Sequence, residues 1–327
     1  MSIAPGLKEL SSWLRSRRAL LESGMSERAI ADACRSGLLR VVRRGWYVEN
    51  GRWMSLSPES RHLLHAVAVA RDGGDGLVLS HVSAAVLWGL PLYRLAPTRV
   101  HLTTPAPARI SSGPDVLRHV APLASADVGV RHGIRCTSLA RTVFDVLRMA
   151  SPEAAVSCGD AAERLIALDG REWNQDAVGE WRHDLARRVE EASGARGVRQ
   201  ARWLAPFADG RAQLPGESVS RLQLHRLRFA PPRLQVVVAA PGSGRYDIDF
   251  ALDDVRAFGE FDGEIKYLDE RMRAGRSVER VLLDEKRRED WIRGTTQYRF
   301  VRWGAAEAAH PEALARHLAA FHIHPPR

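Results

Sequence analysis

Carboxylate side chains gather in the last third of this 327-residue sequence, in segments that have the pattern of β-strands. The stretch 256–262 has the strand period of two, so Glu260 and Asp262 would project from one face. A preceding strand over 246–250 carries Asp249. A hairpin that pairs the two strands would place Asp249 beside Glu260.

This concentration of acidic groups predicts a divalent cation. Two or three carboxylates at one spot repel each other strongly unless a cation neutralises them. Mg²⁺ takes hard oxygen ligands, keeps several waters and recruits substrate phosphate. A metal ion so placed can activate water and stabilise the charge that develops on a phosphate being cut. These residue types therefore favour phosphodiester hydrolysis with Mg²⁺ as the cofactor.

The acidic strands belong to a longer run of expected elements. A helix that opens at 215–217 would carry Val219, Leu222 and Leu227 on one apolar face. The elements expected after it are a strand over 234–239, a glycine-rich turn at 242–244, the strands 246–250 and 256–262, a helix over 278–292 and a strand over 297–303.

These residues carry a family resemblance. The matching motifs are Pro215-Gly216-Glu217-Ser218, Gln235-Val236, Asp249-Phe250, Glu260-Phe261-Asp262-Gly263, Lys266-Tyr267 and Glu285-Lys286-Arg287-Arg288. In this order they resemble the PD-(D/E)XK nuclease core, and more closely the very-short-patch-repair-like (Vsr-like) endonuclease domains. The resemblance implies a restriction-endonuclease-like α/β core with a mixed four-stranded sheet flanked by helices. It also implies that Glu217, Asp249 and Glu260 are the metal ligands.

One position departs from the family pattern. The lysine expected two residues after the strand glutamate is Asp262 here. Asp262 could be a further ligand, or Lys266 could reach back to the attacking water or the scissile phosphate. The expected catalytic set is therefore Glu217, Asp249, Glu260, Asp262 and Lys266. The structural alternatives are a polar strand edge with an exposed ion pair and, for Glu217, an i,i+4 pair with Arg221.

The expected helix over 278–292 is rich in arginine. Arg287 and Arg288 would lie near the acidic residues and could contact DNA phosphates. The same helix also has the spacing for internal ion pairs, such as Asp284 with Arg288.

The first region, 1–58, is basic, with ten lysine and arginine residues against five acidic ones. Ser26 can cap a helix that ends at Gly37, and the segment 38–48 has the composition of a hairpin with its tip at 43–45. Helix, turn, helix and basic hairpin form the layout of a winged helix-turn-helix domain. The second helix would enter the major groove while the hairpin meets phosphates.

Five arginines in this region are the expected DNA contacts. They are Arg28 and Arg35 on the helix and Arg40, Arg43 and Arg44 on the hairpin. The alternative interpretation is a small helical cap that only packs on the next domain.

The middle region, 59–206, mixes helices and strands. Ser80 would cap a helix over 81–90, Ser138 one over 139–149, and Pro152 would begin another. The strands expected between the first two helices cover 99–103, 116–120 and 128–135. Further helices are expected around 180–192 and 198–205.

A second, looser resemblance covers the first two regions. Its motifs are Arg44-Gly45-Trp46-Tyr47-Val48, Leu79-Ser80-His81, Trp88-Gly89-Leu90-Pro91 and the stretch 137–145. They are similar to abortive-infection type IV antitoxins, a family that binds promoter DNA as a repressor and counters a nucleotidyltransferase toxin. The resemblance implies DNA and a toxin as partners.

Four histidines of the middle region invite a metal site. They are His81, His101, His119 and His132. Their spacings match no ligand pattern, and capping and strand contexts account for them. We therefore expect structural histidines.

Composition limits the class of protein. A net charge of +9 favours a polyanionic partner, nucleic acid first. No run approaches 18 consecutive apolar residues, and the N-terminus lacks a signal-peptide layout, so we expect no membrane partner and a cytoplasmic location. Three scattered cysteines fit a reducing compartment.

The sequence thus predicts an α/β multidomain protein. Its domains would be a winged helix over 1–58, an antitoxin-like α+β region over 59–206 and an endonuclease-like domain over 207–327. The favoured function is Mg²⁺-dependent hydrolysis of DNA, with a homodimer as one arrangement for cutting both strands. The competing hypothesis is an antitoxin-type transcriptional repressor whose nuclease fold is inactive.

Overall fold

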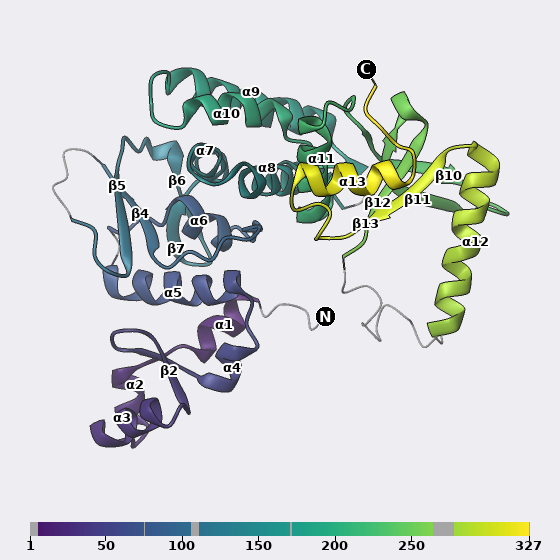
Figure 1. The fold of residues 1–327 in the computed structure, drawn as a ribbon. Helices are drawn as coiled ribbons and strands as arrows, with labels where there is room; N and C mark the ends of the chain where they lie inside the picture. The colour runs from purple at the N-terminus through teal and green to yellow at the C-terminus, as the bar shows by residue number, and fades with distance from the viewer. Residues whose placement is uncertain (1–5, 75, 106–110, 171, 264–277, 327) are drawn as a thin grey trace. The chain divides into compact units, whose positions relative to one another are not determined.

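A computed structural model describes residues 6–74, 76–105, 111–170, 172–263 and 278–326. The protein is a mixed α/β protein that divides into two compact units (Figure 1). The N-terminal unit comprises 2–158 and 175–207, and the C-terminal unit comprises 159–174 and 208–327. Helix α8 (Pro152–Ala167) contributes residues to both. The expected middle region therefore supplies 159–174 to the unit that holds the expected nuclease-like domain.

The first elements of the N-terminal unit follow the expected order. They are α1 (Leu7–Trp13), β1 (Arg15–Ser16), α2 (Arg17–Glu22), α3 (Glu27–Arg35), β2 (Leu39–Arg43), β3 (Trp46–Glu49) and α4 (Asn50–Met54). The strands form a sheet in the order β1-β3-β2. Ser26 caps α3 by accepting a hydrogen bond from the Ala29 amide at 3.2 Å. The predicted helix and hairpin are confirmed as elements.

Helix α5 (Pro58–Gly73) joins two hydrophobic cores in this unit. Leu64 and Val67 pack with Leu10, Leu14 and Val48 of the preceding elements. The opposite side of α5 supplies a second set of side chains, which pack against the following elements: Ala66 and Val69, with Leu79, Val100 and Leu102. Because α5 is buried on both sides, it fixes the basic elements against the rest of the unit.

The remainder of the N-terminal unit combines short strands with long helices. Its elements are α6 (His81–Leu87), β4 (Val100–Thr104), β5 (Val116–Val120), β6 (Val128–Arg131), β7 (Ile134–Thr137), α7 (Leu139–Met149), α9 (Gln175–Glu191) and α10 (Val198–Phe207). Strands β4 and β5 pair in parallel. The expected single strand over 128–135 is instead a hairpin, because His132 and Gly133 both adopt left-handed backbone angles.

The C-terminal unit contains the mixed four-stranded sheet that was expected. Its elements are β8 (Leu168–Asp169), β9 (Glu172–Trp173), α11 (Pro215–Arg226), β10 (Arg233–Ala239), β11 (Arg245–Leu252), β12 (Ala257–Phe261), α12 (Val278–Thr296), β13 (Arg299–Trp303) and α13 (Pro311–Ala320). The sheet order is β10-β11-β12-β13, antiparallel except for the parallel pair β12–β13.

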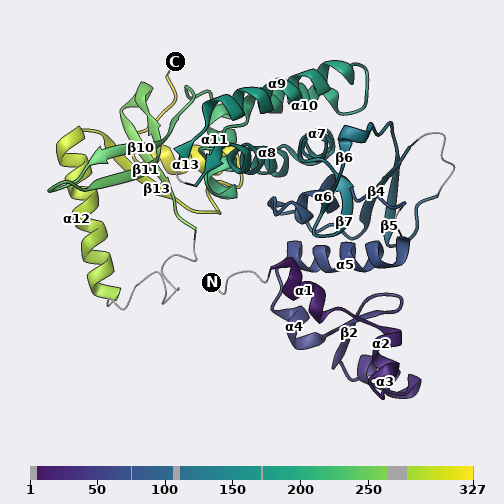
Figure 2. The same cartoon turned by 180° about the vertical axis from the view of Figure 1, so that it is seen from behind.

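Helices cover both faces of this sheet (Figures 1 and 2). On one face, Leu314 and Leu318 of α13 pack with Phe250 and Trp303. On the other face, Ile292 of α12 packs with the second set of strand side chains, among them Ile248, Phe258 and Phe300. The predicted alternation in β12 is confirmed, because Ala257 and Phe261 lie in the first core and Phe258 lies in the second.

A buried ion pair supports helix α11. Arg221 donates to both oxygens of Asp160 at 2.9 and 3.0 Å, and the Asp209 amide donates to the same carboxylate at 2.9 Å. Arg221 is therefore held by Asp160 of α8, and both Arg221 and Glu217 are buried, so neither lies on the exposed helix surface considered as an alternative. The pair anchors the helix that carries Glu217.

No helix among the described residues is both long enough and apolar enough to cross a membrane.

Candidate functional site

Two of the expected metal ligands converge on one side-chain amide. The Gln235 Nε2 donates to Glu217 Oε2 at 3.2 Å and to Asp249 Oδ1 at 3.4 Å. Glu217 lies in the first turn of α11 and is 4% exposed, and its Oε2 also accepts the Gln213 amide at 2.8 Å. Gln235 has a left-handed φ of +50°, a strained conformation for a residue with a side chain.

Asp249 occupies a break in the strand ladder. Pairing between β11 and β12 ends with Phe250 opposite Gly259. Beyond that point Asp249 Oδ2 accepts the Phe261 amide at 2.9 Å, so the side chain takes the place of a main-chain acceptor. Asp249 and Glu260 lie beyond the last pair of this ladder, so the predicted placement of Asp249 opposite Glu260 is not among its pairs.

Glu260 is held by arginines. Its carboxylate accepts two hydrogen bonds from Arg288 of α12, one of them 3.1 Å long, and Arg302 Nε lies 3.4 Å from Oε2. Arg288 also donates to the Asp247 carbonyl at 2.8 Å. Burial alone would lower the pKa of Arg288, but its bonds with Glu260 outweigh burial and raise it. A bidentate arginine on a carboxylate that is 9% exposed is a strong, directional contact.

The structure does not bring the three predicted carboxylates within ligand distance of one another. Among the described residues, no set of three acidic oxygens lies within 4.8 Å. Glu217 and Asp249 share an amide, while Glu260 binds Arg288. As arranged, the three acids therefore do not fit one Mg²⁺ ion. Asp262 lies 3.9 Å from Arg302, and Lys266 falls outside the described residues.

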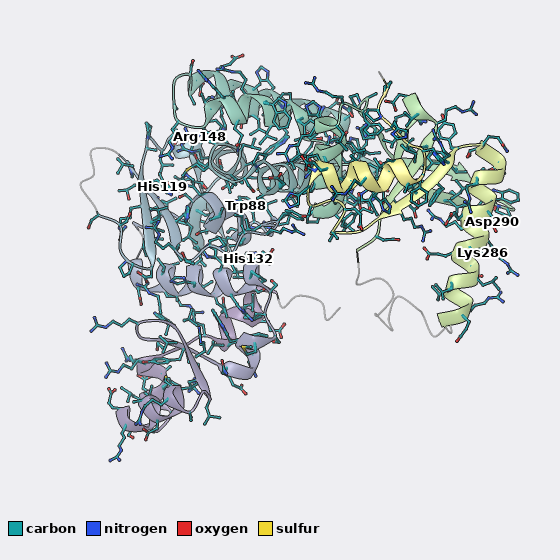
Figure 3. The ribbon with its side chains drawn as sticks, in the orientation of Figure 1. Trp88, His119, His132, Arg148, Lys286 and Asp290 are labelled. Carbon is teal, nitrogen blue, oxygen red and sulfur yellow. The ribbon has the colours of Figure 1, made fainter. Side chains whose placement is uncertain are left out.

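A groove of about 770 Å³ opens beside Arg288. Its lining combines acidic, basic and aromatic side chains of α12 with residues of the β10–β11 hairpin: Pro241, Tyr246, Val281, Asp284, Glu285, Arg287, Arg288, Asp290 and Trp291. Arg287 is exposed, whereas Arg288 is half-buried. Figure 3 shows Lys286 and Asp290 on the same helix.

The arginines of the first region differ in how accessible their side chains are to a ligand. Arg28, Arg35, Arg40 and Arg44 are exposed on α3, β2 and the hairpin turn. Arg43 is half-buried instead, with Asp72 and Asp115 each 3.1 Å from its guanidinium. Arg43 would have to leave both carboxylates before it could reach a phosphate.

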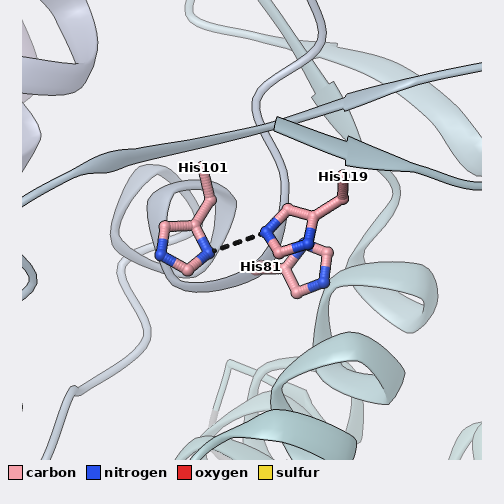
Figure 4. A group of neighbouring side chains, drawn as sticks. All are labelled: His81, His101 and His119. Atoms are coloured by element: carbon pink, nitrogen blue, oxygen red, sulfur yellow. Dashed lines mark hydrogen bonds between the residues drawn. The ribbon is translucent and has the colours of Figure 1, made fainter. Parts of the chain in front are cut away.

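Three histidines meet in the N-terminal unit (Figure 4). One ligand nitrogen from each of His81, His101 and His119 lies within 4.8 Å of the others. His119 Nε2 is 3.1 Å from His101 Nδ1, and the His81 ring stacks on that of His119 with centroids 3.7 Å apart. Burial lowers the pKa of His81 to about 2 and of His101 to about 3, so both rings are neutral at physiological pH.

The fold explains why these histidines come together. In the parallel pair β4–β5, Thr103 lies opposite His119, so His101 and His119 share a face two residues apart. The Ser80 amide donates to the His101 carbonyl at 3.0 Å, which places the following His81 beside the strands. The sequence predicts that the Ser80 side chain caps α6, and this is wrong: Ser80 Oγ bonds the His81 ring at 2.9 Å and makes no capping hydrogen bond.

Sequence reasoning missed two features. The motif that contains Gln235 does not indicate its link between Glu217 and Asp249, because that link depends on the backbone conformation of Gln235. The spacing of the three histidines in the chain matches no ligand pattern, so it does not indicate that they meet. Two of the predicted strands each contain a histidine, and pairing of these strands would have predicted that His101 and His119 lie close together.

Comparisons with known proteins give similarity without a function. No protein-family model matches the chain. Two Mycobacterium tuberculosis proteins, the uncharacterized protein MT2308 of strain CDC 1551 / Oshkosh and the uncharacterized protein Rv2248 of strain H37Rv, are each 27% identical over 265 residues. The match covers 77% of this chain and 88% of each relative. The crystal structure of the RV2827C protein from M. tuberculosis covers 72% of this chain and 87% of its own, with 13% identity and a TM-score of 0.33.

Proposed function

We propose that this chain is a DNA-binding regulator, with a winged helix at its N-terminus and a nuclease-like C-terminal unit that contacts DNA without cutting it. The observation that carries the proposal is the set of four exposed arginines on α3 and the β2–β3 hairpin: Arg28, Arg35, Arg40 and Arg44. A helix with a basic hairpin beside it offers one element for a groove and one for the backbone.

The contacts of these arginines indicate which of them can bind phosphates. Arg28 and Arg44 form no ion pair with any other described residue, so their guanidinium groups are available to phosphates. Arg35 pairs with Asp32 on the same exposed helix surface, a contact that contributes little in water. Arg43 is left out of the proposed interface because Asp72 and Asp115 already hold it.

The acidic cluster supports binding rather than cutting. Glu260, the ligand that a metal-dependent nuclease would need, accepts both of its short contacts from Arg288. Arg302 lies beside Glu260, Asp262 and Glu285. These guanidinium groups already provide the positive charge that the sequence assigned to Mg²⁺. At the position where the resembled nuclease family has a lysine, this chain has Asp262, which carries no positive charge.

Salt dependence of DNA affinity tests the proposal. Fluorescence anisotropy with labelled duplex DNA should show affinity falling steeply as salt rises. Arg44→Ala should reduce the slope of log K against log salt by about 1, and Arg28→Ala by a similar amount. The matched control is Arg316→Ala, an exposed arginine on α13 that should leave the slope unchanged. Affinity that does not respond to salt would overturn the proposal.

A Mg²⁺-dependent endonuclease is the second candidate function. The observation in its favour is the convergence of Glu217 and Asp249 on Gln235, which puts two acids from α11 and β11 at one point. Calorimetry of Mg²⁺ binding to the full chain tests it. This candidate predicts stoichiometric Mg²⁺ binding that is lost in Asp249→Ala, whereas the regulator predicts no stoichiometric binding by either chain.

A further inference from the structure

We propose that His81, His101 and His119 form a binding site for a divalent transition-metal ion, with Zn²⁺ the best match. The three side chains come from the start of α6 and from the parallel strands β4 and β5. This site lies in the N-terminal unit and does not depend on the acidic cluster or on DNA binding.

The distances suit a small coordination sphere. Zn²⁺ binds imidazole nitrogen at 2.0–2.1 Å, so two ligands of a tetrahedral ion stand about 3.3 Å apart. His101 Nδ1 and His119 Nε2 are 3.1 Å apart and face each other (Figure 4). A nitrogen of His81 lies within 4.8 Å of both. Because the His81 ring stacks on that of His119, metal binding would require the His81 ring to turn its nitrogen toward the other two.

The chemistry of the ligands selects the class of metal. Imidazole nitrogen suits Zn²⁺, Cu²⁺, Ni²⁺ and Fe²⁺, whereas Mg²⁺ prefers oxygen. Metal ions bind the neutral form of histidine. His81 is 4% exposed and has two other imidazole rings as close neighbours.

A cavity beside the rings leaves room for a fourth ligand. It measures about 240 Å³, and His81, His101 and Asp145 line it. Asp145 is 0% exposed, and its Oδ1 makes no hydrogen bond within the described part of the chain. Its Oδ2 lies 3.9 Å from His81 Nδ1. A buried carboxylate that can accept a hydrogen bond from a metal-bound water or orient a ligand ring is a common partner of metal sites.

Charged side chains of both signs surround the site. Arg141 donates to Asp145 at 2.9 Å and to Asp127 at 3.2 Å, so its charge is offset by two carboxylates. The Arg148 guanidinium lies over the Phe144 ring, 5.0 Å from its centroid. Figure 3 shows Arg148 and His119 on the same part of the unit. A divalent ion bound by the three imidazole rings would lie near Asp145, whose Oδ1 can accept a further hydrogen bond.

Calorimetric titration of the full chain with Zn²⁺ tests the site, after removal of any histidine tag and treatment with EDTA. We expect one Zn²⁺ per chain and no competition from Mg²⁺. His101→Ala and His119→Ala should each weaken Zn²⁺ binding at least 100-fold. The matched control is His132→Ala, which removes an exposed histidine of the β6–β7 turn and should leave the affinity unchanged.

Two further measurements separate ligand loss from misfolding. Far-ultraviolet circular dichroism of the metal-free variants should match that of the native chain. Co²⁺ added to the native chain should give the strong visible absorption of a four-coordinate ion. Asp145→Asn should keep the one-to-one stoichiometry and weaken Zn²⁺ binding 10- to 100-fold, as expected for a positioning residue.

The proposal fails on any of three results. The native chain could bind no Zn²⁺ in stoichiometric amount. His132→Ala could weaken binding as much as His101→Ala, which would indicate adventitious surface binding. Co²⁺ could bind without four-coordinate absorption, which would exclude the three-nitrogen site even if the alanine variants do not fold.

Discussion

The acidic cluster of the C-terminal unit and the histidine cluster of the N-terminal unit differ in how their charge is balanced. Gln235, Arg288 and Arg302 already neutralise or occupy the acidic side chains. Burial lowers the pKa of His81 and His101, and the His101 and His119 rings contact each other through a nitrogen pair 3.1 Å apart. The region with the stronger sequence motif is thus the one whose groups are engaged within the protein.

This difference shows what a motif can and cannot establish. The spacing from Asp249 to Glu260 predicts a hairpin, and β11 and β12 do pair as far as Phe250 and Gly259, but Asp249 lies beyond that pairing and accepts the Phe261 amide. Spacing does not predict which cation satisfies Glu260, because Arg288 comes from a helix 28 positions further along the chain. Ligand chemistry and local charge decide between a metal and an arginine.

The largest expected effect concerns the support of the acidic cluster. Asp160→Ala should lower the free energy of unfolding by about 3–5 kcal/mol, because it leaves Arg221 buried without its partner. Urea unfolding measures the loss. The matched control is Asp253→Ala, whose exposed pair with Arg233 should contribute no more than about 1 kcal/mol. Equal losses in both variants would show that α11 does not depend on the buried pair.

Acid should lower the free energy of unfolding through His62, a buried histidine near the histidine cluster. Burial lowers the pKa of His62 from 6.5 to about 4. The unfolded chain therefore binds more protons than the folded chain between these pH values, so the free energy of unfolding falls as pH decreases through this window. For this one residue the loss reaches about 3 kcal/mol.

His62→Gln isolates that contribution. The difference in unfolding free energy between the native chain and His62→Gln should shrink as pH falls from about 7 to about 4. Denaturant titrations at several pH values measure it. His132→Gln, which replaces an exposed histidine, is the matched control for removal of an imidazole. A constant difference for His62→Gln would mean that folding does not lower the pKa of this histidine.

The smallest expected effect separates two neighbouring arginines. Arg288→Met should lower the free energy of unfolding by about 2 kcal/mol, since Glu260 loses two charged hydrogen bonds. It should also let Mg²⁺ raise the melting temperature, because the released carboxylate gains access to a cation. Arg287→Met, on the exposed side of α12, should do neither. If Mg²⁺ raised the melting temperature of both variants equally, Arg288 would not be the group that keeps Mg²⁺ from Glu260, and the contrast between the two clusters would be lost.

Much of the C-terminal unit could be predicted from sequence. The expected strand 234–239 is β10 (Arg233–Ala239). The expected helix 278–292 is α12, which begins at Val278 and ends at Thr296. Short strands between turn residues give local signals that suffice for such elements. The left-handed conformation of Gln235 is not signalled locally, because glutamine rarely adopts it.

The histidine cluster shows a different limit. Both strands that carry His101 and His119 were predicted, but their parallel pairing was not. Parallel pairing joins segments through a long connection, and no local pattern specifies the partner. Ligand spacing rules apply to sites built from one or two neighbouring elements, whereas these three rings come from α6, β4 and β5.

The most direct test of the account follows supercoiled plasmid DNA mixed with the full chain in Mg²⁺ at low salt. One gel measures both retardation of the plasmid and its conversion to nicked or linear forms. The proposed regulator predicts retarded plasmid that stays supercoiled after the protein is removed. Nicked plasmid that disappears with EDTA and with Asp249→Ala would contradict it and establish the nuclease.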